Sequence, residues 1–390
     1  MTTDPFPSVP ESAVAAGANA ARVAVGASVA GMAAGADGSP SGASAEHRIV
    51  IIGVGGTIAM RVDAEGSNAA PGAQPDASMF PIPGVTLDFR EVANVGSPSL
   101  QVEHIVAALQ EADAAVADGA RGVVITHGTD TLEETAFFLN RFWPHDAPLV
   151  VTGAMRPANA PGADGPANLH DSIIAAASDN ARGLGVLAVF DSLVHSADRA
   201  TKASSRSVDA FASEPSGPLA IVNGRSLTHV YALPPTPARL PLSVLLSQDS
   251  SGPTPSALPT VPVLGIGLFD HGEALAALLG AAGGAAAEGA EETTAKTGSE
   301  PRIAGLVING VGMGHVPETV VPLVRRAVES GITVVVATRI PEGGTSTHHY
   351  SYPGSEADLI RNGAIMAGSL SAHKARIQLQ ALLAAGSTKE

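Results

Sequence analysis

The sequence predicts an α/β fold built on a parallel sheet, and three observations support this prediction. Short continuous apolar runs, such as residues 48–54 and 122–126, are typical of strands buried on both faces. These runs alternate with longer segments of helical periodicity, which is the pattern of strand–helix–strand units. The length of 390 residues suits two medium-sized domains, or one large domain with a smaller partner, and an apolar fraction of 45% is enough for a buried core.

Strands and helices alternate through the first half of the chain. The predicted strands are residues 48–54, 122–126, 149–152 and 185–190, and the predicted helices are residues 102–118, 131–143 and 167–178. The first helix has one apolar stripe, and the second begins with TLEE, which matches the capping box that opens helices. Residues 61–83 are rich in Gly, Pro, Asp and Ser, and we predict a loop long enough to suggest function or mobility.

The same alternation returns after a stretch dense in Pro and Ser at residues 234–262, which we interpret as an interdomain linker. The predicted strands are residues 263–268, 303–309 and 332–337, and the predicted helices are residues 272–279, 317–329 and 372–384. We therefore predict an N-terminal catalytic domain over residues 47–233 and a C-terminal domain over residues 263–390.

Two segments lack any periodic pattern. Residues 280–300, rich in Gly, Ala and Glu, are predicted as a flexible surface insertion. Residues 1–46, rich in Ala, Gly and Ser, are predicted as a disordered extension. This extension lacks the basic start of a secretory signal, so we expect a cytoplasmic protein.

Composition excludes several kinds of site. The chain has no cysteine, which excludes disulfides, thiolate metal ligands and a thiol nucleophile. Its formal net charge of −15 repels phosphate backbones, so we expect no nucleic-acid partner. The longest apolar runs have the length of strands, so we expect no membrane span. The 12 histidines show no metal-ligand spacing, and we expect no metal.

A glycine turn follows the first predicted strand and ends in a single hydroxyl. Gly55 and Gly56 allow the backbone to approach a ligand closely, and Thr57 comes next. A dinucleotide-binding turn requires Gly or Ala where this chain has Ile58, and an acidic residue at the end of a second strand, whereas Asp76 lies in a loop. Thr57 is therefore a candidate nucleophile, or it only forms hydrogen bonds within its turn.

Two further polar segments follow strand ends. Residues 126–131, with the sequence THGTDT, precede a helix whose N-terminus suits a substrate carboxylate or an oxyanion, unless Asp130 and Thr131 only cap that helix. Lys202 lies in a loop after the fourth strand and either acts on a threonine hydroxyl or is a solvated surface charge. Ligands of open α/β sheets bind at the carboxyl ends of strands, so we expect Thr57, Thr129, Asp130 and Lys202 to meet there.

These segments resemble the bacterial-type L-asparaginase family. The matching motifs are GGTIA at 55–59, VITHGTDTLEETA at 124–136, VTGAMRP at 151–157, DGPANL at 164–169, TK at 201–202 and KAR at 374–376. The resemblance implies a larger N-terminal α/β domain and a smaller C-terminal one, each with a parallel sheet flanked by helices. It also implies a homotetramer, a dimer of dimers, with sites between the N-domain of one subunit and the C-domain of a neighbour. No cofactor is implied, and the reaction is hydrolysis of L-asparagine to L-aspartate and ammonia.

The same resemblance implies a role for each candidate residue. Thr57 matches the nucleophile that forms the acyl-enzyme, whereas Thr129, Asp130 and Lys202 match the group that poises water and shuttles protons. Ser97 matches the serine that contacts the substrate α-carboxylate, and Asp130 also matches the partner of the α-ammonium. The substrate-binding residues that the resemblance implies are Gly56, Ser97, Gly128, Thr129, Asp130 and Ala154.

Three positions depart from the family pattern. Many members carry a tyrosine that helps activate the nucleophile in the loop after GGTIA, but residues 61–83 contain none. Pro98 stands where a substrate-contacting glutamine is common, and Met313 stands where a neighbouring subunit often contributes asparagine. These changes fall on the ammonium side of the pocket and on its lid, so we expect altered affinity or specificity with an intact hydroxyl–lysine core.

Two other functions use the same scaffold. A subunit of a tRNA-dependent amidotransferase would need an extra N-terminal domain and a surface for tRNA, which residues 1–46 and the acidic charge do not provide. An amino-acid-binding sensor is suggested by Pro98 and the missing loop tyrosine, and it would bind aspartate without producing ammonia.

Overall fold

The structure is a computed structural model that describes residues 47–62, 69–71, 81–228, 239–249, 252–284 and 303–386. Glu46–Glu390 is one compact unit. The prediction for residues 1–46 lies outside the described residues, as do most of the predicted insertion at 280–300 and most of the predicted loop at 61–83. Residues 280–284 are described and are helical, so the insertion was predicted to begin too early.

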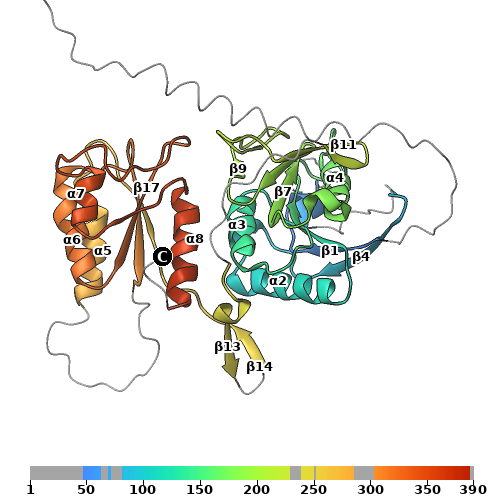
Figure 1. The fold of residues 1–390 in the computed structure, drawn as a ribbon, viewed down its shortest axis with the longest axis horizontal. Helices are drawn as coiled ribbons and strands as arrows, with labels where there is room; N and C mark the ends of the chain where they lie inside the picture. Colours follow the sequence, from blue (N-terminus) through green and yellow to red (C-terminus); the bar gives the residue numbers. More distant parts are fainter. Residues whose placement is uncertain are drawn as a thin grey trace, which may run out of the picture. The chain divides into compact units, whose positions relative to one another are not determined.

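An eight-stranded sheet forms the centre of the N-terminal half (Figure 1). Its strands, in spatial order, are β12 (Ser226–Thr228), β11 (Ala220–Asn223), β8 (Leu193–Ser196), β7 (Val186–Phe190), β6 (Leu149–Thr152), β5 (Gly122–Thr126), β1 (His47–Gly53) and β4 (Val85–Glu91). Strands β7, β6, β5, β1 and β4 are parallel to one another. At the other edge the pairs are antiparallel, β8 with β7, β11 with β8 and β12 with β11. Two short antiparallel pairs lie outside this sheet. One is formed by β2 (Met60–Val62) and β3 (Ala69–Pro71), and the other by β9 (Thr201–Lys202) and β10 (Phe211–Ala212).

Helices cover both faces of this sheet, which explains the continuous apolar strands. Val50 and Ile52 of β1 pack into the core formed with α2 (Val102–Ala117) and α3 (Leu132–Phe142). Ile49 and Ile51 point to the opposite face, where α4 (Gly165–Ala177) packs. A strand between two helical layers has no face in water, so the buried residues 49–52 of β1 are all apolar.

The strand order creates a switch point beside β1. The strand that follows β1 in this sheet, β4, pairs with one edge of β1, and the chain then crosses over to place β5 on the other edge. From β5 the order continues outward through β6 and β7. The loops that leave β1 and β5 therefore diverge at the carboxyl ends of two adjacent strands, which is where open α/β sheets form their binding crevice.

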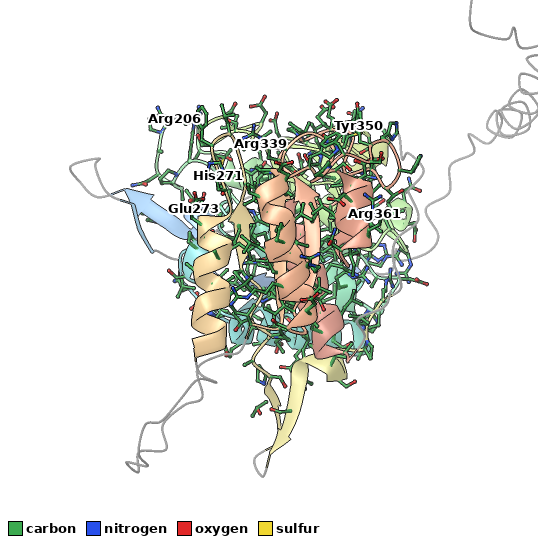
Figure 2. All side chains as sticks on the ribbon, turned by 90° about the vertical axis from the view of Figure 1, so that its left-hand side faces the viewer. Arg206, His271, Glu273, Arg339, Tyr350 and Arg361 are labelled. Carbon is green, nitrogen blue, oxygen red and sulfur yellow. The ribbon has the colours of Figure 1, made fainter. Side chains whose placement is uncertain are left out.

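A second, smaller parallel sheet occupies the C-terminal half. Its strands, in spatial order, are β15 (Val263–Gly265), β16 (Gly305–Gly310), β17 (Thr333–Thr338) and β18 (Ile365–Met366). The helices are α5 (Glu273–Gly284), α6 (Val321–Glu329) and α7 (Glu356–Arg361) on one face, and α8 (Ala372–Ala384) on the other (Figure 1). The loops that carry His271, Arg339 and Tyr350 gather at one end of this sheet (Figure 2).

Helix α8 belongs to two cores. Ala375 and Leu379 pack against the small sheet, whereas Ile377 and Ala381 belong to the core that contains α3. The last helix of the chain thus connects the small sheet to the helical layer beside the large one.

The predicted fold class is confirmed, and the strands at residues 122–126 and 149–152 have the predicted bounds. The sequence did not predict β4 or the antiparallel edge of β8, β11 and β12. These strands lie at or near sheet edges, where mixed polar and apolar residues are tolerated and the local signal is weak. Residues 234–262 contain a 3₁₀ turn, η6 (Leu242–Leu245), and a hairpin of β13 (Leu246–Asp249) with β14 (Gly252–Pro255).

Candidate active site

The turn that carries Thr57 touches the THGTDT segment directly. Gly55 and Gly56 have φ angles of 110° and 97°, a conformation that favours glycine. A Cβ atom on Gly56 would lie 2.3 Å from the backbone nitrogen of Gly128, so no side chain fits there. Thr57 follows at once and begins a 3₁₀ turn, η2 (Thr57–Ala59), so its backbone lies one residue from this contact.

Other loops approach the same segment. A Cβ atom on Gly128 would lie 2.7 Å from Oγ of Ser97, and one on Gly153 would lie 2.4 Å from the carbonyl oxygen of His127. Ala154 follows Gly153 and is buried. The loops after β1, β5 and β6 therefore converge with the turn of Ser97, and Gly56, Ser97, Gly128 and Ala154 lie in this convergence.

Lys202 connects the two polar side chains of the THGTDT segment. Its Nζ donates to Oγ1 of Thr129 at 2.9 Å and to Oδ1 of Asp130 at 2.7 Å. Thr129 is buried with 6% of its surface exposed, the Lys202 side chain is 16% exposed, and that of Asp130 is 64% exposed. The amine and hydroxyl are thus shielded from water, whereas the carboxylate keeps an accessible side. This arrangement polarises the Thr129 hydroxyl and allows proton exchange between Oγ1 and Nζ.

Lys202 lies in a short strand rather than in the predicted loop. Strand β9 pairs with β10, so that Lys202 is opposite Phe211. The backbone N–H of Lys202 also donates to the carboxylate of Glu133 on α3. Both contacts involve residues distant in sequence, which is why the local pattern indicated only a loop.

The predicted capping box at residues 131–134 is wrong. Thr131 is the N-cap of α3, but its hydroxyl donates to the carbonyl oxygen of Ser97 at 3.0 Å. Glu134 forms an ion pair with Arg376 of α8 at 2.9 Å. Both side chains take partners far along the chain, and these contacts bind α3 to the turn of Ser97 and to α8.

His127 is a site residue that the sequence did not single out. It is fully buried, and its Nδ1 lies 2.6 Å from the carbonyl oxygen of Gly128. A carbonyl only accepts, so Nδ1 carries the proton and donates. Burial lowers the pKa of His127 to about 4, so the ring is neutral near pH 7. The signal that could have pointed to it is its place within THGTDT, between Thr126 and Gly128.

The contact from His127 orients a peptide group of the site. In a planar trans peptide, the N–H points opposite to the C=O. Because the Gly128 carbonyl points to His127, the N–H of Thr129 points away from it. A fixed N–H of this kind is a suitable donor for a developing oxyanion.

A groove borders the Ser97 side of Thr57, Thr129, Asp130 and Lys202, hereafter the cluster. Its volume is about 340 Å³, and it is lined by Ser97, Pro98 and Thr131 on one side and by Arg376 and Gln380 of α8 on the other. The reactive groups of Thr57 and Lys202 do not line it, so the groove adjoins the cluster without containing it.

Neither a metal centre nor a membrane helix is found in the part of the chain that the structure describes. There, no three or more His, Asp or Glu side chains are grouped to hold a metal ion. None of the described helices is both long and apolar enough to cross a bilayer. The pair His348 and His349 is exposed.

Comparison with known proteins shows which family the chain belongs to. The family described as Asparaginase, N-terminal, matches residues 48–234, and the Glutaminase/Asparaginase C-terminal domain matches residues 285–390. A probable L-asparaginase from Deinococcus radiodurans is 34% identical over 349 residues, which cover 88% of this chain and 95% of that protein. The chain belongs to the bacterial-type L-asparaginase family.

Other members of the L-asparaginase family match almost as extensively. An L-asparaginase from Bacillus licheniformis is 30% identical over 341 residues, covering 86% of this chain and 95% of that protein. The crystal structure of a probable cytoplasmic L-asparaginase from Campylobacter jejuni superposes with a TM-score of 0.71 at 28% identity. The superposition covers 86% of this chain and 95% of the Campylobacter jejuni chain, so the likeness to the family extends over both sheets.

Proposed function

We propose that this L-asparaginase hydrolyses L-asparagine to L-aspartate and ammonia through an acyl-enzyme on Thr57. The observation that supports the assignment most directly is the pair of bonds from Nζ of Lys202, at 2.9 Å to Thr129 and 2.7 Å to Asp130. They lie on the segment that the glycine turn of Thr57 touches. Two hydroxyls, one amine and one carboxylate suit acyl transfer followed by hydrolysis.

In the first step, Oγ of Thr57 attacks the side-chain amide carbon of asparagine. A C–O bond forms, and the carbonyl electron pair moves to the oxygen, which becomes an oxyanion. The N–H of Thr129, on the peptide that His127 orients, is our candidate donor to that oxyanion. When the C–N bond breaks, the proton released by Thr57 passes to the nitrogen, and ammonia leaves.

In the second step, water attacks the acyl carbon and releases aspartate. We assign activation of this water to Thr129, whose hydroxyl takes a proton from the water as it gives its own to Nζ of Lys202. Nζ passes one of its protons to the carboxylate of Asp130 at the same time. The carboxylate of Asp130 compensates the charge on the amine. Thr57 takes back a proton as its C–O bond breaks, which restores the enzyme.

Binding of the substrate backbone is assigned to the exposed side of the cluster. The Asp130 side chain is 64% exposed, so it can hold the α-ammonium while it accepts from Lys202. Ser97 and the backbone of Gly56 and Gly128 are assigned to the substrate α-carboxylate and the atoms next to it. The backbone of Ala154 is assigned to the side-chain amide.

The central experiment measures ammonia release from L-asparagine and L-glutamine side by side, using the wild type and Thr57→Ala. We expect turnover of asparagine by the wild type, and loss of detectable turnover in Thr57→Ala with an unchanged circular dichroism spectrum. Thr86→Ala, at an exposed threonine of β4, is the matched control and should keep full activity. Near-normal turnover in Thr57→Ala would refute the nucleophile, and aspartate binding without any ammonia from the wild type would select the sensor.

We further propose a cytoplasmic homotetramer with domains at residues 47–233 and 263–390. The location is supported by the Campylobacter jejuni relative, which is described as cytoplasmic. Assembly is supported by Leu268 and Phe269, which follow β15 with 84% and 85% of their surface exposed, since adjacent exposed apolar side chains often mark interfaces. Sedimentation should show a tetramer that Leu268→Asp with Phe269→Asp dissociates, and a monomeric wild type would contradict the assembly.

A further inference from the structure

Lys374, the first residue of the KAR segment, has a position that its own helix does not favour. It lies in the first turn of α8, where the helix dipole opposes a positive charge. Only 2% of its surface is exposed, so burial adds a desolvation penalty. Contacts outside α8 must therefore stabilise the buried amine of Lys374.

The amine of Lys374 binds the turn that leads into β9. Its Nζ donates to the carbonyl oxygen of Ala200 at 2.6 Å and to that of Asp198 at 3.1 Å. Ala200 is completely buried and comes two residues before Lys202. The ring of Phe137 on α3 lies 5.9 Å from the same Nζ. The amine thus joins α8 to the backbone that places the lysine of the active site.

Helix α3 holds the same turn from another side. The carboxylate of Glu133 accepts from the backbone N–H of Lys202, and the side-chain amide of Asn140 donates to Oδ1 of Asp198 at 3.1 Å. Glu133 and Phe137 are four residues apart, so they lie on one face of the helix. The segment from Asp198 to Lys202 is therefore fixed between α3 and α8.

We propose that Lys374 is a positioning residue that keeps Nζ of Lys202 at the hydroxyl of Thr129. The inference rests on the role assigned to Lys202 in the proposed function. Without Lys374, the carbonyls of Asp198 and Ala200 lose their donor in a buried place, and the turn must shift to find other partners. A displacement of about 1 Å is enough to reduce turnover by roughly 10²-fold.

The charge of Lys374 is compatible with this role. Burial lowers its pKa to about 8, while the carboxylates of Glu133, Asp198 and Glu134 raise it and Arg199 lowers it. The amine therefore remains mainly protonated near pH 7 and keeps all its N–H donors for the two carbonyls.

The first test compares Lys374→Met with Arg376→Met. Arg376 lies on the same helix and binds the same neighbour, α3, through Glu134, but it does not touch the turn before Lys202. We expect Lys374→Met to lower kcat for L-asparagine by about 10- to 100-fold, with KM changed less than about threefold. Arg376→Met should keep kcat near the wild-type value, and Lys374→Arg should recover most of the loss. Equal kcat in Lys374→Met and Arg376→Met would overturn the proposal.

The second test places Lys374→Met in a Lys202→Met background. If Lys374 acts through Lys202, the double variant loses no more kcat than Lys202→Met alone, whereas independent roles multiply the two losses. Multiplied losses would overturn the positioning role and leave the proposed function intact. Wild-type turnover in Lys202→Met would instead overturn the proposed function. If Lys374→Met does not fold, Lys374→Gln replaces it in the cycle, because the amide keeps N–H donors.

Discussion

At the scale of single residues, Thr129 and Thr57 differ in their burial and in their hydrogen bonds. Thr129 is buried, and its hydroxyl accepts from Lys202, so the direction of its own O–H is restricted. Thr57 follows the glycine turn after β1, and its side chain is half-buried, so part of its surface remains exposed. A hydroxyl with a fixed amine beside it suits proton transfer, and a hydroxyl on an open turn suits attack on a substrate.

This difference leads to a prediction for Thr129→Val, which removes the hydroxyl and keeps the shape. We expect kcat to fall by roughly 10²- to 10⁴-fold, the usual contribution of a positioned proton-transfer group, with a smaller change in KM. Steady-state kinetics on L-asparagine provides the measurement. Thr135→Val, at a buried threonine of α3, is the control and should alter stability more than kcat. A Thr129→Val enzyme with an unchanged kcat would exclude the assigned proton transfer.

At the scale of elements, the site depends on how closely two turns approach. The turn after β1 and the segment after β5 are in contact because Gly56 has no side chain. Gly119, between α2 and β5, has a similar φ of 85°, but a Cβ atom there would meet nothing within 4 Å. Both glycines have a positive φ that would strain any residue with a Cβ atom, but only at Gly56 would that atom meet neighbouring backbone.

Gly56→Ala and Gly119→Ala form a matched pair. Both should lose about 1–2 kcal/mol of stability, because alanine disfavours the left-handed region. Gly56→Ala should lose more than Gly119→Ala, because its Cβ atom also meets the backbone of Gly128. Only Gly56→Ala should also lose asparagine turnover, by at least about 10²-fold, since the added carbon displaces the backbone of Gly128. Denaturant titration and ammonia release measure the two effects. Similar turnover in both variants would show that the contact of the turns is unimportant for the reaction.

At the scale of the whole molecule, stability depends on buried neutral histidines as well as on apolar packing. Burial lowers the pKa of both His127 and His195 to about 4. Nε2 of each ring is buried and has no hydrogen-bond partner among the described residues. His195 lies in β8, where its Nδ1 is 2.8 Å from the hydroxyl of Ser213, away from the proposed chemistry. Protonation of either ring would therefore bury an unpaired charge.

The sign of the resulting pH dependence follows from linkage. Between pH 6.5 and about 4, the unfolded chain binds more protons at these two histidines than the folded chain. The free energy of unfolding should thus be highest above pH 6.5 and fall as the pH drops toward 4, by about 3 kcal/mol for each histidine. Urea titrations across this range measure the slope. His195→Gln should make the fall shallower, and an unchanged slope would contradict the assignment to His195.

The sequence alone allowed those parts of the fold to be predicted that depend on neighbours along the chain. Strands β1 and β5 were predicted because burial on both faces requires an unbroken apolar run. Thr57 and THGTDT were singled out because turns and helix starts have local patterns. The roles of Ser97 and Ala154 came only from the family resemblance, since neither has a local pattern of its own.

Tertiary structure alone decided which polar groups pair. The hydroxyl of Thr131 and the carboxylate of Glu134 matched a capping box, yet they bind Ser97 and Arg376. The burial of Lys374 and its two carbonyl partners also could not be predicted, because 174 residues separate it from Ala200. Hydrogen bonds over such separations depend on the order of strands and the packing of α8. A polar side chain takes the partner that the assembled core brings within reach, and its neighbours in sequence do not specify that partner.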